Sequence, residues 1–158
     1  MKLQRLTICA ECKYLRDDIA VISSPTTNID KVSNKPPVRL LIVDDDLDVV
    51  YVLKHGLLSH GFLVDAFTNP EEALQKFKSN PASYSLVLSD SLMPAISGIQ
   101  LAKIVKDANP NVKVLLLSGS EMIDGERSNG FPSYSVDDFV QKPISIRQLA
   151  DKILTLIS

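Results

Sequence analysis

The chain has 158 residues, of which 45% are hydrophobic and 23% are charged, and its formal net charge is −2. This length and composition suit a single globular domain with a full hydrophobic core, and the charge lacks the basic excess of most nucleic-acid-binding domains. No apolar stretch approaches the roughly 18 residues that are needed to cross a membrane. At the N-terminus, Lys2 and Arg5 interrupt the apolar residues, so no signal-peptide core is expected there. We therefore expect a cytoplasmic protein that neither spans a membrane nor binds nucleic acid by itself.

Residues 1–37 differ from the rest of the chain and are expected to form an N-terminal extension and linker with some disorder. From Ser23 to Pro37 the sequence is rich in Ser, Thr, Asn, Lys and Pro, a composition typical of a linker. Before it, apolar residues recur at loosely helical spacing and favour a short amphipathic helix only weakly. These residues are Leu3, Leu6, Ala10, Leu15, Ile19 and Ile22.

The two cysteines, Cys9 and Cys12, both lie in this extension. A Cys-x-x-Cys pair supplies half of a tetrahedral zinc site, and no second pair exists to complete it. His55 and His60 fall in or just after a predicted helix of the following domain and are not obvious partners. Reduced thiols are the favoured interpretation, with redox activity or a zinc ion shared between two chains as alternatives.

From Val38 onward, strand and helix patterns alternate. The first apolar run, broken only by Arg39, is typical of a central strand covered on both faces. The helix after it has apolar residues at i, i+3 and i+4 and ends before Gly61, and Asn69-Pro70 is a strong start for the next helix. The predicted order is a strand at 38–43, a helix at 46–60, a strand at 62–67 and a helix at 69–80.

The second half of the chain repeats this alternation. A buried strand at residues 86–88 runs to Asp90 and ends there, because Pro94 and Gly98 prevent it from continuing. Residues 119–137 contain several glycines and few apolar residues, and they predict only an irregular, mobile helix. The other predicted elements are a helix at 98–108, strands at 112–117 and 139–141, and a helix after Ser145. Strands that alternate with helices in this way predict an α/β fold with a parallel sheet.

Polar groups follow these predicted strands at the points where the strands end. In isolation, Asp90 would more simply cap a turn, but three other strand ends also carry polar groups. Because the carboxyl ends of parallel strands meet at one edge of the sheet, we expect these groups to converge. Oxygen ligands suit Mg²⁺, and a hydroxyl and an ammonium suit phosphate oxygens. The groups are Asp44, Asp45 and Asp46 after the first strand, Asp90, Ser118 and Lys142.

These motifs, in this order, resemble the receiver domain of response regulators, the CheY-like phosphoacceptor module of two-component signalling. The resemblance covers residues 38–158 and is carried by Asp44-Asp45, Asp90 within Asp-Ser-Leu-Met-Pro with Gly98 after it, Ser118, and Lys142-Pro143. It implies a flavodoxin-like, doubly wound sheet of five parallel strands in the order 2-1-3-4-5 with helices on both faces. It also implies a cis Lys142-Pro143 bond. Members of the family have a regular fourth helix where this chain has residues 119–137, and the irregular helix predicted there is a departure from the family.

The resemblance further implies a chemistry for the strand ends. Asp90 would accept a phosphoryl group from a phosphohistidine of a sensor histidine kinase or phosphotransfer protein. Lys142 would pair with the phosphoryl oxygens, Ser118 would donate its hydroxyl to them, and Phe139 would pack inward as Ser118 moves. The implied Mg²⁺ ligands are Asp44, Asp45, Asp90 and the backbone carbonyl of Leu92, whereas Asp46 is expected to cap the following helix.

No output domain follows the last helix of the sequence, so the chain is expected to act as a stand-alone receiver on an unknown downstream protein. Leu92 and Ser120 occupy positions that influence self-dephosphorylation in the family, and neither favours an attacking water, which predicts a long-lived phosphoform. One alternative is a receiver fold used only for protein binding, without phosphorylation. The other is an α/β phosphatase with an aspartate nucleophile, but such enzymes generally carry a second acid where this chain has Leu92.

Overall fold

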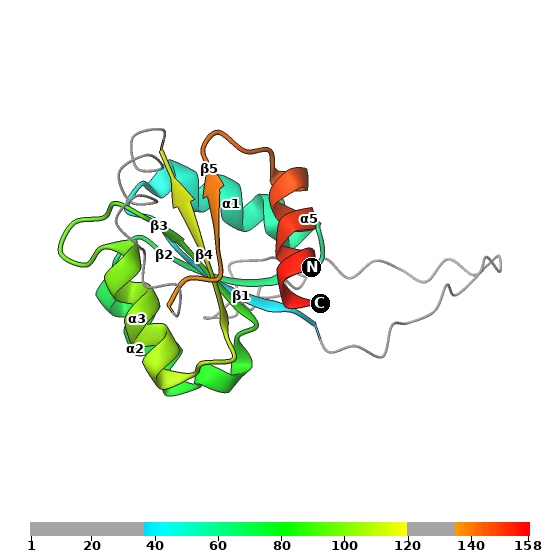
Figure 1. The fold of residues 1–158 in the computed structure, drawn as a ribbon. Helices are drawn as coiled ribbons and strands as arrows, with labels where there is room; N and C mark the ends of the chain where they lie inside the picture. The colour runs from blue at the N-terminus through cyan, green and yellow to red at the C-terminus, as the bar shows by residue number, and fades with distance from the viewer. Residues whose placement is uncertain (1–36, 120–134) are drawn as a thin grey trace, which may run out of the picture. The chain divides into compact units, whose positions relative to one another are not determined.

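The computed structural model describes residues 37–119 and 135–158. Its five strands form a parallel sheet in the order β2-β1-β3-β4-β5 (Figure 1), which confirms the predicted doubly wound α/β fold. The strands are β1 Arg39–Val43, β2 Leu63–Phe67, β3 Leu86–Asp90, β4 Lys113–Ser118 and β5 Asp138–Gln141. The helices of the described residues are α1 Leu47–Ser59, α2 Pro70–Ser79, α3 Gly98–Ala108 and α5 Ile146–Ile157, with a 3-10 turn, η1, at Pro81–Ser83.

Helices cover both faces of the sheet, and this explains the continuous apolar runs of the central strands (Figure 1). Successive side chains of a strand point to opposite faces. In β1, Leu41 and Val43 therefore pack with buried residues of α2 and α3, whereas Leu40 and Ile42 pack with those of α1 and α5. Both sides of a central strand must be apolar in such an arrangement. The sheet is thus packed on both faces, and only its edges are left for polar residues.

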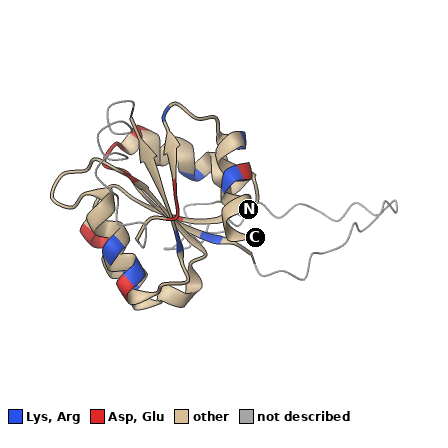
Figure 2. Ribbon diagram, in the orientation of Figure 1, with Lys and Arg blue, Asp and Glu red and all other residues tan. Residues whose placement is uncertain are grey.

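The helix ends are set by local side chains, as the sequence predicts. Asp46 caps α1 by accepting hydrogen bonds from the amides of Asp48 and Val49, at 2.8 and 3.3 Å. After that helix, Gly61 adopts a positive φ of 87°, a conformation that glycine reaches without strain. In α2, acidic residues lie in the first turn and basic residues in the last, which complements the helix dipole. Figure 2 colours the charged residues of the described chain.

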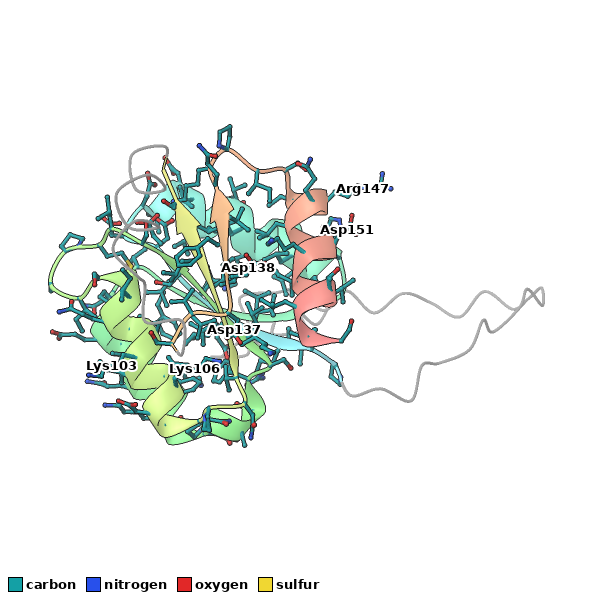
Figure 3. The ribbon with its side chains drawn as sticks, viewed as in Figure 1. Lys103, Lys106, Asp137, Asp138, Arg147 and Asp151 are labelled. Carbon is teal, nitrogen blue, oxygen red and sulfur yellow. The ribbon has the colours of Figure 1, made fainter. Side chains whose placement is uncertain are left out.

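A charge cluster joins the start of β5 to α3 and β4 (Figure 3). The Asp137 carboxylate lies 2.6 Å from Lys106 Nζ and 3.3 Å from Lys113 Nζ, and it accepts a 2.8 Å hydrogen bond from the Val114 amide. Burial alone would raise the pKa of Asp137, but these donors outweigh burial and hold the pKa below its ordinary value. The cluster therefore favours the charged carboxylate in the folded chain.

Several predictions fall on residues outside the described ranges. They include the irregular helix at 119–137, most of which lies at 120–134, and the extension that carries Cys9 and Cys12. The boundary near residue 38 also stays a prediction. Within the described residues, the helices are all too short or too polar to cross a membrane.

Candidate functional site

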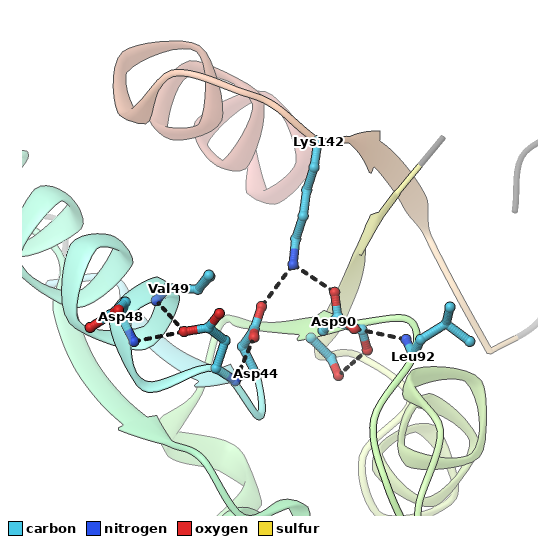
Figure 4. Close-up of polar contacts among 8 residues, drawn as sticks. Asp44, Asp48, Val49, Asp90, Leu92 and Lys142 are labelled. Atoms are coloured by element: carbon cyan, nitrogen blue, oxygen red, sulfur yellow. Dashed lines mark hydrogen bonds and ion pairs between the residues drawn. The ribbon is translucent and has the colours of Figure 1, made fainter. Parts of the chain in front are cut away.

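The carboxyl edge of the sheet brings three of the predicted site residues, Asp44, Asp90 and Lys142, into contact (Figure 4). Strands β1 and β3 are neighbours whose register pairs Val43 with Ser89, so Asp44 and Asp90 come next at adjacent positions. The Lys142 amide donates a 2.8 Å hydrogen bond to the Ser118 carbonyl, which fixes the end of β5 beside the end of β4. The Lys142-Pro143 peptide bond is cis, which confirms the prediction.

Lys142 bridges the two buried carboxylates. Its Nζ lies 2.9 Å from Asp44 Oδ2 and 2.7 Å from Asp90 Oδ1 (Figure 4). Burial works to lower the pKa of Lys142, but hydrogen bonds and charge from the two carboxylates outweigh it and raise the pKa. The sequence predicts that Lys142 reaches this edge, but the contact with Asp44 is new information from the structure.

Asp44 is the most deeply buried acid of the site, with only 2% of its surface exposed. Burial raises the pKa of Asp44 above its ordinary value, with a smaller contribution from the Asp90 charge, although Lys142 and the Asp46 amide oppose the change. The Asp46 amide donates to Asp44 Oδ1 at 3.0 Å. This carboxylate therefore depends on nearby positive charge to stay ionised.

The loop after β3 fixes the other side of Asp90. The Leu92 amide donates a 2.8 Å hydrogen bond to Asp90 Oδ2. The Gly98 amide donates to the Ser91 carbonyl at 3.1 Å, which closes the loop against α3. A Cβ atom at position 98 would lie 2.2 Å from the Asp90 carbonyl oxygen, so this contact requires glycine. The sequence predicts a role for the Leu92 carbonyl, but the contact observed with Asp90 comes from the Leu92 amide.

Asp45 lies apart from the other two acids. It is exposed, and it makes no hydrogen bond or ion pair with another described residue. In the part of the chain that the structure describes, no three His, Cys, Asp or Glu side chains are grouped closely enough to hold a metal ion. Even so, the donor set fits the chemistry of Mg²⁺, which prefers oxygen ligands, and Asp44 and Asp90 already share one cationic group.

Ser118 and Phe139 occupy the strand ends predicted for them. Ser118 is buried, and its hydroxyl donates a 2.9 Å hydrogen bond to the Gly119 carbonyl. Phe139 is partly buried and packs against the core between the sheet and helices α2 and α3. The β4–β5 register pairs Phe139 with Leu116, two residues before Ser118. The two residues thus lie on neighbouring strands, and their roles in switching stay predictions.

Comparison with known proteins adds evidence that is independent of this geometry. The family model of the response regulator receiver domain matches residues 40–154. The transcriptional regulatory protein CpxR homolog of Haemophilus influenzae is 37% identical over 120 residues, which cover 75% of this chain and 50% of that protein. The response regulator receiver protein CpdR of Brucella abortus is 28% identical over 115 residues, which cover 73% of this chain and 92% of that protein.

Among solved structures, a response regulator receiver domain protein from Clostridium thermocellum matches with a TM-score of 0.70 at 24% identity. The match covers 76% of this chain and 94% of that one, and it supports the fold. The chain spans about half the length of the first curated relatives that it matches. A family match over most of the chain, on a sheet of the expected strand order, shows that this chain belongs to the response regulator receiver domains of two-component regulatory systems.

Proposed function

We propose that Asp90 accepts a phosphoryl group from a phosphohistidine of a sensor histidine kinase or phosphotransfer protein. The observation that carries this proposal is the position of Asp90 at the end of a buried strand, between the Leu92 amide and the Lys142 ammonium. In the proposed step, a carboxylate oxygen of Asp90 attacks phosphorus and forms a P–O bond. The P–N bond to the donor imidazole breaks, and the imidazole nitrogen keeps the bonding electron pair.

Charge is the main obstacle to this reaction, because a carboxylate must approach an anionic phosphoryl group. Lys142 reduces this repulsion by donating to the phosphoryl oxygens. Asp44, Asp45, Asp90 and the backbone carbonyl of Leu92 would hold Mg²⁺, which when bound supplies further positive charge. This metal assignment is supported by the oxygen-rich donor set and by the family of the chain.

The output of the reaction is proposed to be a change in protein contacts. Ser118 would turn its hydroxyl from Gly119 to the new phosphoryl group, and Phe139 would pack more deeply into the space that this movement opens. An unknown downstream protein would read the altered surface. The cytoplasmic location and the lack of nucleic-acid binding stay predictions. Stand-alone action also stays a prediction, because the match covers 92% of one relative but only 50% of another.

Intact-mass measurement after incubation with acetyl phosphate and Mg²⁺ tests the proposal. We expect a mass gain of one phosphoryl group in the wild type and none in Asp90→Asn. Asp107→Asn is a matched control, because Asp107 is an exposed acid on α3 with no contact to the site, and it should label like the wild type. An unlabelled wild type would support the alternative of a receiver fold used only for protein binding. Labelling of Asp90→Asn would show that a residue other than Asp90 accepts the phosphoryl group.

A further inference from the structure

Gly56 is an unfavourable residue for its place in the interior of α1. Glycine in a helix interior is less stable than alanine, because it loses more backbone entropy on folding and has no side chain to pack. The nearby side chains of Leu53 and Leu57 are buried in the core that α1 shares with α5. A glycine at this position therefore calls for an explanation in the packing of the two helices.

Ile146, the first residue of α5, fills the space beside Gly56. A Cβ atom on Gly56 would lie 2.8 Å from each of three side-chain atoms of Ile146, Cγ1, Cγ2 and Cδ1. A side chain that is branched at Cβ has few rotamers in a helix, so it cannot easily turn both Cγ atoms away from such a contact. The absence of a side chain at Gly56 thus determines how closely the beginning of α5 approaches α1.

A short connection links the beginning of α5 to the site. Residues 143–145 join Ile146 to Lys142, whose Nζ lies 2.7 Å from Asp90 Oδ1. The last of them, Ser145, caps α5 with its side chain, so it moves together with the helix. Because no long loop lies between Ile146 and Lys142, a shift at the beginning of α5 is expected to displace Lys142 as well.

We propose that Gly56 is a positioning residue for phosphoryl transfer: it seats Ile146 against α1 and thereby holds the loop of Lys142 at the correct distance from Asp90. This inference rests on the proposed function, which gives Lys142 and Asp90 their roles. Gly56 touches no reacting group, so it acts only through Ile146. Because small misplacements of a catalytic group slow a reaction strongly, added volume at position 56 should slow phosphorylation while Asp90 stays the acceptor.

The rate of labelling by acetyl phosphate and Mg²⁺, followed by intact mass, tests this role with a double-mutant cycle. We expect Gly56→Ala to label about tenfold more slowly than the wild type. Ile146→Ala should also label more slowly, because the loop loses its seat. The double variant should label faster than either single variant, because the smaller residue at 146 makes room for the methyl group at 56. Additive losses, or wild-type labelling of Gly56→Ala, would overturn the proposal.

Ile153→Val separates positioning from stability. Ile153 is a fully buried residue of α5 in the same core, away from the beginning of the helix, and loss of a methyl group there lowers stability. Under conditions in which urea denaturation shows every variant to be folded, it should label at the wild-type rate. Labelling as slow as that of Gly56→Ala would overturn the proposal. An unlabelled wild type would overturn the proposed function, whereas a labelled wild type with an equally fast Gly56→Ala would overturn this inference alone.

Discussion

Leu92 lies beside the site, where the residue is 63% exposed and its amide donates a hydrogen bond to Asp90. An acyl phosphate is lost when water attacks phosphorus in line, and an apolar side chain at this position cannot orient that water. We therefore expect Leu92→Asn to lose its phosphoryl group several-fold faster than the wild type, because the amide side chain can hydrogen-bond the attacking water. Decay of purified phosphoprotein, followed by intact mass, measures this rate. Unchanged or slower decay would show that water access at Leu92 does not limit the lifetime.

Ala95 is the non-glycine residue with a positive φ, 67°, among the described residues. This conformation costs an L-residue about 1–2 kcal/mol, whereas glycine adopts it readily. We expect Ala95→Gly to raise the free energy of unfolding by about 1 kcal/mol or less. Glycine removes the unfavourable φ of the folded state, but it also increases the conformational entropy of the unfolded chain, which offsets part of this stabilisation. Urea denaturation measures the change.

Ala108→Gly serves as the control for that substitution, because Ala108 is an exposed residue of α3 with ordinary helical backbone. Glycine in a helix is less favourable than alanine by up to about 1 kcal/mol. The two variants should therefore change stability in opposite directions. A loss of stability in Ala95→Gly would show that the loop tolerates its positive φ without strain.

The packing of α3 against β3 depends on Gly98, whose position leaves no room for a Cβ atom beside the Asp90 carbonyl. We expect Gly98→Ala to reduce the free energy of unfolding by about 2–3 kcal/mol, because the backbone of the phosphoacceptor loop must shift. Gly119→Ala is the matched control, since a Cβ atom there meets nothing within 4 Å. Equal effects of the two variants in urea denaturation would contradict this account of the loop.

The Asp137 cluster links α3, β4 and β5, and its pKa shift predicts a pH dependence. The folded pKa of Asp137 is lowered, so its carboxylate stabilises the fold at pH values above the ordinary pKa of about 4, and this contribution is lost as pH falls through the folded value. At pH 7, Asp137→Asn should lower the free energy of unfolding by about 2 kcal/mol, because two lysines lose their charged partner.

Thermal denaturation of wild type and Asp137→Asn across pH 3 to 7 checks this dependence. The difference between the two proteins should begin to shrink as pH falls below about 4, because the Asp137 carboxylate of the unfolded wild type then binds a proton more readily than that of the folded protein. Asp107→Asn, which removes an exposed acid of α3, should follow the wild type at every pH. A difference that stays constant down to pH 3 would mean that the negative charge of Asp137 is not what stabilises the cluster.

At the scale of the whole molecule, the sequence predicts the sheet and most of the site because one physical feature determines both. Continuous apolar runs specify strands buried on both faces, and the residue that ends each run must lie at the carboxyl edge. Asp44, Asp90, Ser118 and Lys142 are therefore found where the pattern predicts them.

Other details depend on side-chain directions and loop geometry that no periodic pattern encodes. Asp44 and Asp45 are neighbours in sequence, yet one is buried and the other exposed, because the turn after β1 directs them differently. The contact between Lys142 and Asp44 depends on the path of a long side chain. The positive φ of Ala95 lies in a loop whose sequence offers no glycine at that position.

Chemical trapping of the phosphoform tests the central claim, phosphorylation of Asp90, most directly. Borohydride reduces an acyl phosphate to an alcohol, which converts a phosphorylated aspartate to homoserine. Peptide mapping of the trapped wild-type protein by tandem mass spectrometry is then expected to find homoserine at position 90 after treatment with acetyl phosphate and Mg²⁺, and aspartate there without it. Homoserine at Asp44, Asp45 or another acid, with position 90 unmodified, would contradict the account.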